Sequence, residues 1–194
     1  MSIPNIFFKT ARDLAKQNKN IQDIILFGSF VKGKTKVNDV DILIIFASLI
    51  DKSTESDFKK KLSSYVLDIN SVTLDEFRSE SFIAKEGIFL EGISLLRKKA
   101  ISQEQGFFSI ALVKYKLDDV KGSKRTRLYY ALNGRNDQKG FLKEIGAKRF
   151  SQNSIFFPYE KIEEVKQFFE LWGVEIQIIP TMIPLRLKHL LLGN

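Results

Sequence analysis

The chain has 194 residues and a formal net charge of +8, a length that allows two small domains, each with a modest core. Its composition, 44% hydrophobic and 28% charged, is that of a globular protein, and its lack of cysteine excludes disulfides and thiolate metal sites. The longest apolar stretch is too short to span a membrane and the N-terminus lacks an export signal, so we expect a cytoplasmic protein without membrane contact.

Residues 1–102 are predicted to form an α+β domain. The first element is an amphipathic helix at 4–17, because Phe7, Ala11 and Leu14 fall on one face. Apolar and β-branched runs predict strands at 24–27, 39–46 and 65–72, with a polar helix at 55–62. A longer helix is expected at 74–98, with breaks allowed at Gly87 or Gly92, and a polar linker follows it.

Residues 106–194 are predicted to form a second, accessory α+β domain. Its expected elements are a strand at 107–117, a helix at 121–132, a short helix at 141–145, a hairpin of 147–150 with 154–157, a helix at 160–172, and a strand at 174–179 that ends before Pro180. Strand, helix, two strands, helix, strand is the order of a ferredoxin-like domain.

The strongest functional signal lies between the first two predicted strands. The first strand ends in Gly28 and Ser29, a basic loop with Lys32 and Gly33 follows, and Asp39 opens the next strand. Gly28 allows a sharp turn and a close approach of the backbone to a ligand. Ser29 can cap a following helix, whose free N–H groups and positive dipole end would face a phosphate.

Two carboxylates stand at the start of the second strand. Asp39 and Asp41 are two residues apart, so their side chains project from one face while Val40 points to the other. Such close charges raise each other's pKa or destabilise the fold unless cations lie between them. Carboxylate oxygens suit Mg²⁺ or Mn²⁺ better than zinc. The segment therefore predicts a site for a nucleoside triphosphate and its metal ions.

This ordered set resembles the active-site signature of the DNA polymerase beta superfamily of nucleotidyltransferases, especially its minimal branch. The signature is Gly-Ser, a further glycine, and then Ser-Asp-x-Asp. The matching residues are Gly28, Ser29, Gly33, Asp39 and Asp41. Asn38 replaces the usual serine, although its side chain can make the same local turn hydrogen bonds. The resemblance covers about residues 20–95 and implies a mixed sheet with flanking helices.

The resemblance also implies a third carboxylate on a neighbouring strand. Asp68 is the only acid in the run 65–73, and the resemblance makes it both a metal ligand and the general base. The alternative is an ordinary surface acid on an edge strand. If Asp68 is only a surface acid, Asp75 and Glu76 are the next candidates for the third carboxylate.

By resemblance, the chain transfers a nucleoside monophosphate from an NTP, with ATP as first choice, to an acceptor hydroxyl and releases pyrophosphate. Two magnesium or manganese ions would be held by Asp39, Asp41 and Asp68. The expected nucleotide contacts are Gly28, Ser29, Lys32, Gly33 and Asn38. A nucleic-acid 3′ end, a toxin-like partner protein and a small hydroxylated molecule remain open as acceptors, and a homodimer is open too. The rival interpretation is a non-catalytic nucleic-acid-binding or antitoxin-like interaction protein with a vestigial nucleotide site.

Positive charge is concentrated in the second half of the chain. Residues 1–105 carry 16 Lys and Arg against 14 Asp and Glu, a net of +2, while residues 106–194 carry 15 against 9, a net of +6. The tract 121–130 places basic residues beside two tyrosines, which suits phosphates and stacked bases. A solvated helix face is the alternative. The predicted polyanion contacts are Lys121, Lys124, Arg125 and Arg127.

Overall fold

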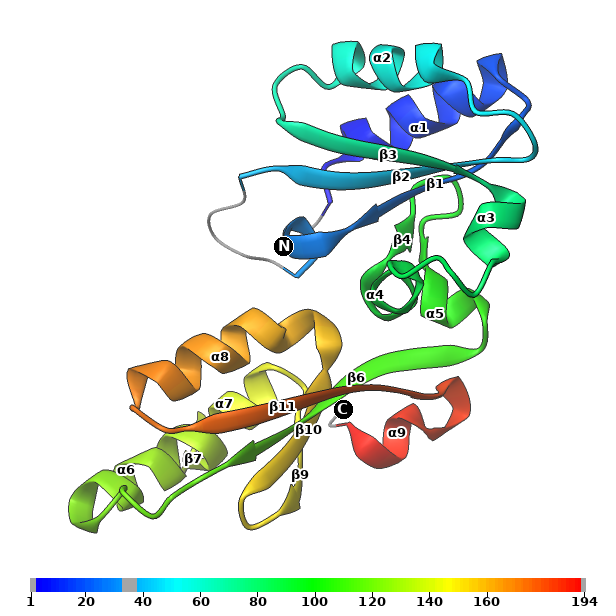
Figure 1. The fold of residues 1–194 in the computed structure, drawn as a ribbon. Helices are drawn as coiled ribbons and strands as arrows, with labels where there is room; N and C mark the ends of the chain where they lie inside the picture. Colours follow the sequence, from blue (N-terminus) through cyan, green and yellow to red (C-terminus); the bar gives the residue numbers. More distant parts are fainter. Residues whose placement is uncertain (1–2, 33–37, 193–194) are drawn as a thin grey trace. The chain divides into compact units, whose positions relative to one another are not determined.

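The computed structural model describes residues 3–32 and 38–192, and the chain divides into two compact units, Met1–Gln105 and Gly106–Asn194 (Figure 1). Each unit contains a β-sheet with helices packed on it, so the predicted α+β class is confirmed. Within the described part of the chain, no helix combines the length and the apolar character that crossing a membrane requires.

The first unit is built on a five-stranded mixed sheet in the order β3-β2-β1-β4-β5. Its strands are β1 Ile21–Phe27, β2 Val40–Phe46, β3 Leu67–Thr73, β4 Ile93–Ser94 and β5 Lys99–Ala100. Strand β2 runs parallel to β3 and antiparallel to β1. The mixed sheet implied by the resemblance is therefore present, and its parallel pair β2–β3 contains Asp41 and Asp68.

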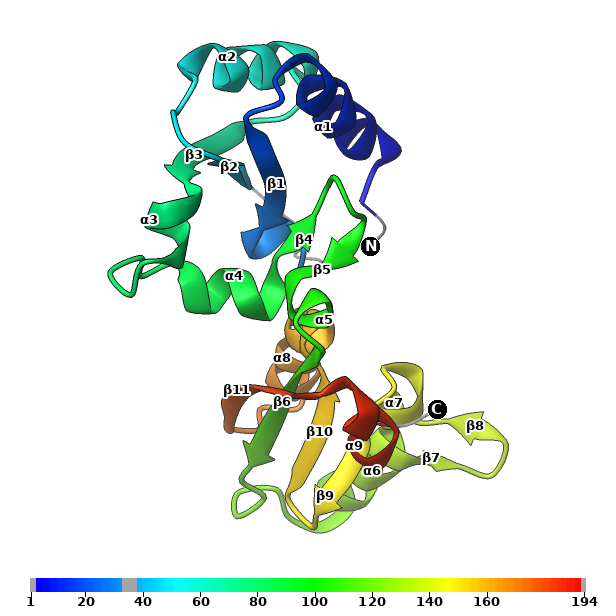
Figure 2. The same cartoon turned by 90° about the vertical axis from the view of Figure 1, so that its right-hand side faces the viewer.

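Helices cover both faces of this sheet (Figures 1 and 2). They are α1 Asn5–Gln17, α2 Lys52–Lys61, α3 Leu74–Arg78, α4 Lys85–Glu91 and α5 Ile101–Glu104, with one 3₁₀ turn, η1 Gly28–Phe30. One core joins α1 and α2 to the side chains of Ile42 and Ile44, and a second core joins α4 and α5 to Leu43 and Ile45. Strand β2 is thus buried on both faces, which accounts for its continuous apolar sequence.

The break allowed at Gly92 is present, but the prediction of helix on both sides of it over 74–98 is wrong, because this segment forms α3, α4 and β4. Helix α3 ends at Ser79, whose ψ of 144° is not helical. Gly92 caps α4 with an extended backbone, and a Cβ there would lie 2.4 Å from the carbonyl oxygen of Ile88. The next residues, Ile93 and Ser94, pair with β1. Sheet pairing at long range therefore overrides the local helical pattern.

A buried acid ties β1 to the end of the first unit. Asp23 is 4% exposed and accepts hydrogen bonds from Ser94 Oγ at 2.7 Å and from the Arg97 guanidinium, which also pairs with Glu104. Burial raises the pKa of Asp23 above its ordinary value, against the hydrogen bond from Ser94 and the charge of Arg97. The acid remains tolerable in the core because these partners satisfy its oxygens.

Arg97→Met is expected to lower the free energy of unfolding by about 1–3 kcal/mol, because it leaves the buried Asp23 without its cation. The midpoint of urea unfolding, followed by circular dichroism, measures the effect. Lys99→Met is the matched control, since Lys99 is exposed two residues away. Equal midpoints for the two variants would show that the Asp23–Arg97 pair contributes nothing to stability.

The second unit has an antiparallel sheet in the order β11-β6-β10-β9. Its principal elements are β6 Phe107–Tyr115, α6 Gly122–Asn133, β9 Lys148–Ser151, β10 Ser154–Pro158, α8 Ile162–Leu171 and β11 Ile176–Pro184. Smaller elements are the hairpin β7 Gly134–Arg135 and β8 Gln138–Lys139, with α7 Phe141–Glu144, η2 Tyr159–Lys161, η3 Leu185–Leu187 and α9 Lys188–Leu191. The order of the principal elements is ferredoxin-like, as predicted.

The core of this unit lies between one face of the sheet and helices α6, α7 and α8, while residues at α9 pack on the other face. The prediction that the last strand ends before Pro180 is wrong, since β11 continues to Pro184 and Pro180 pairs with Ala111. Strand β11 is an edge strand, where a residue without an N–H group is tolerated.

Candidate active site

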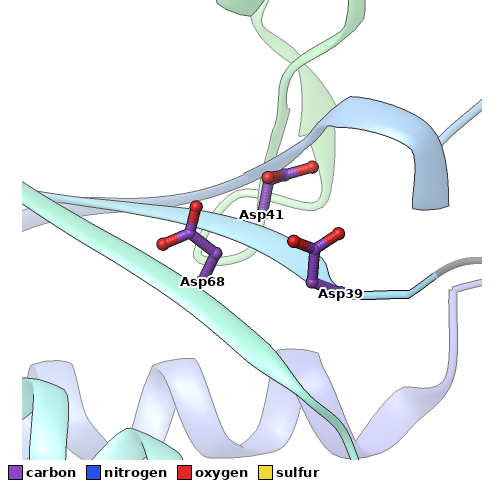
Figure 3. Close-up of side chains that lie close together, drawn as sticks. All are labelled: Asp39, Asp41 and Asp68. Atoms are coloured by element: carbon purple, nitrogen blue, oxygen red, sulfur yellow. The ribbon is translucent and has the colours of Figure 1, made fainter.

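Three aspartates meet at one end of the parallel pair β2–β3. Asp41 and Asp68 are each the second residue of their strand and are direct partners across the pair. Asp39 lies two residues before Asp41, on the same side of the pleat. One carboxylate oxygen of each residue lies within 4.8 Å of the others. Figure 3 shows the three side chains gathered beside the β2 and β3 ribbons.

The electrostatics of this cluster favour a bound cation. Asp41 is half-buried, and its burial is the largest cause that raises its pKa above the ordinary value. The negative charges of Asp39 and Asp68, and then of Glu91, raise the pKa of Asp41 further. A divalent cation among these oxygens would remove the repulsion, and an all-carboxylate set of hard donors fits Mg²⁺ or Mn²⁺.

The glycine turn and the acid cluster are in direct contact. Gly28 has a φ of +76°, in the left-handed region that side chains rarely adopt, and it opens the η1 turn directly after β1. A Cβ at this position would lie 1.8 Å from Asp41 Oδ2. Both the conformation and the space therefore require glycine. The requirement reflects the close approach of the turn to the carboxylate.

Gly28→Ala is expected to displace the Asp41 carboxylate and to lower the free energy of unfolding by at least about 1 kcal/mol, because of the strained φ and the clash. Gly87→Ala is the control, since a Cβ within α4 at Gly87 meets nothing within 4 Å and should leave stability equal or higher. Unfolding midpoints of the two variants decide the matter, and an unperturbed Gly28→Ala protein contradicts the geometry.

Glu91, which sequence reasoning did not single out, holds the turn in place. Its Oε1 accepts a hydrogen bond from the N–H of Gly28 at 2.9 Å, and its Oε2 lies 2.9 Å from the Nζ of Lys32. The Glu91 side chain is only 10% exposed. Glu91 falls within residues 20–95, the range that the resemblance covers, but no local pattern indicates that it reaches Gly28.

The other predicted nucleotide contacts lie around this turn. Lys32 is held in its ion pair with Glu91. Ser29 is half-buried within η1, and Asn38 is exposed beside Asp39. Gly33 lies outside the described residues.

The alternative third carboxylates are not part of the acid cluster found among the described residues. The Glu76 carboxylate instead closes a capping box with Thr73 at the start of α3. Asp75 is exposed in the same helix. Of the acids considered from the sequence, Asp68 is the one that joins Asp39 and Asp41.

The basic tract of the second unit occupies the start of α6. Lys121, Lys124, Arg125 and Arg127 are all exposed. They do not form one uniform surface, because Arg125 lines a cavity, whereas the Lys124 ammonium lies near Gly173 after α8.

Comparison with known families places the first unit. Residues 9–101 match the family model described as polymerase beta, nucleotidyltransferase. This part of the chain is similar to that family. The nucleotidyltransferase domain contains the three clustered aspartates, the Gly28 turn and Glu91, so the resemblance inferred from the motif is confirmed.

Several solved structures are similar to part of the chain. A toxin–antitoxin structure with AMP-PNP is 26% identical, with 45% of this chain and 71% of that chain covered and a TM-score of 0.35. The MNT antitoxin structure with a tri-AMPylated HEPN toxin of Shewanella oneidensis is 25% identical, with 52% and 72% covered and a TM-score of 0.33. The toxin–antitoxin pair MntA–HepT is 22% identical, with 47% and 71% covered and a TM-score of 0.33. Comparison with curated proteins found no match.

Proposed function

We propose that this chain is a metal-dependent nucleotidyltransferase that transfers a nucleoside monophosphate from an NTP, with ATP as first choice, to an acceptor hydroxyl. One observation carries the proposal: three carboxylates converge within 4.8 Å beside a glycine turn, inside a domain of the polymerase beta family. The acceptor oxygen forms a bond to the α-phosphorus, and the bond from that phosphorus to the bridging oxygen breaks. Pyrophosphate leaves with the electron pair.

In this proposal, Asp39, Asp41 and Asp68 hold Mg²⁺ or Mn²⁺. Bound ions would stabilise the charge on the phosphate oxygens and align the attacking and leaving oxygens. Asp68 also takes the proton of the acceptor hydroxyl, a role that suits an exposed carboxylate within reach of solvent and of an incoming acceptor.

The glycine turn receives the triphosphate. Gly28 brings the backbone close to the acid cluster, and Ser29 and Asn38 offer a hydroxyl and an amide to the phosphate oxygens. Glu91 restrains the turn and keeps the Lys32 ammonium beside it, so that a positive charge is in place near the phosphates. The second unit, residues 106–194, would present the acceptor or a partner.

The test is incubation of the protein with α-labelled NTPs, Mg²⁺ and separate pools of RNA, DNA, protein and small hydroxylated molecules. Label transferred to one pool identifies the acceptor class. The protein with Asp39→Asn and Asp41→Asn is the control, and it should transfer none. Binding of ATP without transfer to any pool would favour the vestigial, non-catalytic alternative.

A further inference from the structure

The second unit contains a cavity of about 580 Å³ between α6, the end of β6 and the turn that joins β9 to β10. Its volume falls within the range of small-molecule sites. Two arginines, Arg125 from α6 and Arg149 from β9, line it together with Tyr115 and Tyr129. The cavity lies wholly within this unit, so its composition does not depend on the nucleotidyltransferase domain.

Arg149 is a fixed guanidinium. Its Nη1 donates to the Tyr115 hydroxyl at 2.8 Å and to the Gln152 carbonyl at 3.0 Å, and its Nη2 donates to Asn133 Oδ1 at 3.0 Å. Tyr115 is 2% exposed and stacks on Phe169, so the anchor is itself held by the core. Such a guanidinium loses little freedom when it binds a ligand.

The charge of Arg149 is not neutralised by a carboxylate, because its acceptors are all neutral and no ion pair to it occurs within residues 3–32 and 38–192. Its three hydrogen bonds use three of its roughly five N–H donors, which leaves others for a ligand. A half-buried cation held by neutral groups is suited to an anion.

The remaining lining adds a second cation and a ring. Arg125 is exposed on α6, and Tyr129, one helical turn later, is 58% exposed at the same cavity. Lys116 also lines the cavity but is paired with Glu175 at 2.9 Å. Asp118 is the acid in the lining, so the two arginines leave a net positive charge.

We propose that this cavity binds a phosphate group carried by a nucleoside, either as a free mononucleotide or as the phosphorylated end of an RNA strand. Arg149 and Arg125 contact the phosphate, and Tyr129 stacks on the base. Of the basic tract, only Arg125 takes part; Lys121, Lys124 and Arg127 lie outside the lining. The proposal stands independently of the function proposed for the first unit.

The test uses the full chain with Asp39→Asn and Asp41→Asn, in EDTA, so that the first unit does not contribute metal-dependent nucleotide binding. The probes are AMP, adenosine, and a fluorescent RNA oligonucleotide with or without a 5′-phosphate. Calorimetry and fluorescence anisotropy give the Kd values. The phosphorylated probes should bind at least about tenfold more tightly than their phosphate-free partners, because the charge-assisted hydrogen bonds are lost without the phosphate. Comparable affinity for AMP and the phosphorylated RNA identifies a mononucleotide site, whereas binding of the RNA alone identifies a strand end.

Variants locate the binding. Arg149→Gln and Arg125→Gln should each raise the Kd of a phosphorylated probe about tenfold or more, and Tyr129→Ala should raise it severalfold. Arg186→Gln removes an equal charge from an exposed position in the same unit and should change the Kd by less than about twofold. Arg125 is exposed and has no hydrogen bond or ion pair to another residue that the structure describes. Its variant should therefore remain folded and informative if the melting temperature of Arg149→Gln falls.

The proposal is overturned if the protein with an unchanged cavity binds phosphorylated and phosphate-free probes with equal affinity. It is overturned too if Arg125→Gln binds the phosphorylated probes as tightly as the parent protein does. It is also overturned if Arg186→Gln or Arg127→Gln weakens binding as much as Arg125→Gln does, because the affinity would then come from diffuse surface charge.

Discussion

Asp68→Ala is expected to abolish nucleotidyl transfer while the affinity for the triphosphate stays within about tenfold of the wild type. A general base contributes roughly 10²–10⁴ in rate, and the loss of one metal ligand adds to that effect. Triphosphate binding should persist because the proposed binding groups, Asp39, Asp41 and the Gly28 turn, remain in place. Single-turnover transfer and equilibrium binding of ATP, measured on the same protein, separate the two quantities.

Asp75→Ala is the matched control for this variant, because Asp75 is an exposed acid close in sequence but outside the cluster. It should transfer at the wild-type rate. Full activity in Asp68→Ala, or loss of activity in Asp75→Ala, would show that Asp68 is not the third carboxylate. A large loss of ATP affinity in Asp68→Ala would make this residue chiefly a binding group.

The second large effect concerns Asp39 and Asp41. Mg²⁺ with ATP at about 100 times its Kd should stabilise the wild-type protein by about 2.7 kcal/mol, which raises the melting temperature by a few degrees. The protein with Asp39→Asn and Asp41→Asn should lose most of that shift, because two of its three clustered carboxylates are gone. Thermal melting with and without Mg²⁺–ATP measures both shifts, and an equal shift in the two proteins would place the nucleotide elsewhere.

Without metal and nucleotide, the wild type should no longer be the more stable of the two proteins. The raised pKa of Asp41 means that its ionised form costs stability above its folded pKa, a cost relieved as the pH falls toward the unfolded value of 3.8. At neutral pH in EDTA, the protein with Asp39→Asn and Asp41→Asn should therefore melt at an equal or higher temperature than the wild type. The difference between the two melting temperatures should shrink as the pH falls. A lower melting temperature for the metal-free variant would show that the acids are not repelling one another.

Much of the candidate site follows from local rules. Asp39 and Asp41 share a face because strand side chains alternate, and Gly28 marks the turn because it alone adopts that backbone conformation at no cost. The ferredoxin-like order of the second unit is likewise readable from hydrophobic periodicity. These features depend on neighbours a few residues apart, so the amino-acid sequence determines them by itself.

Other features depend on contacts between distant parts of the chain. Glu91 meets Gly28 across 63 residues, Arg97 meets Asp23 across 74, and Arg149 reaches Tyr115 across 34. The break of the predicted helix 74–98 belongs here too, since Ile93 and Ser94 are extended only because β1 offers them partners. The hydrophobic periodicity of the sequence does not indicate which charged side chain will contact which distant acceptor. The path of the backbone brings these groups into contact. Only the tertiary structure therefore decided how the Gly28 turn is held by Glu91 and where Arg125 and Arg149 come to line one cavity.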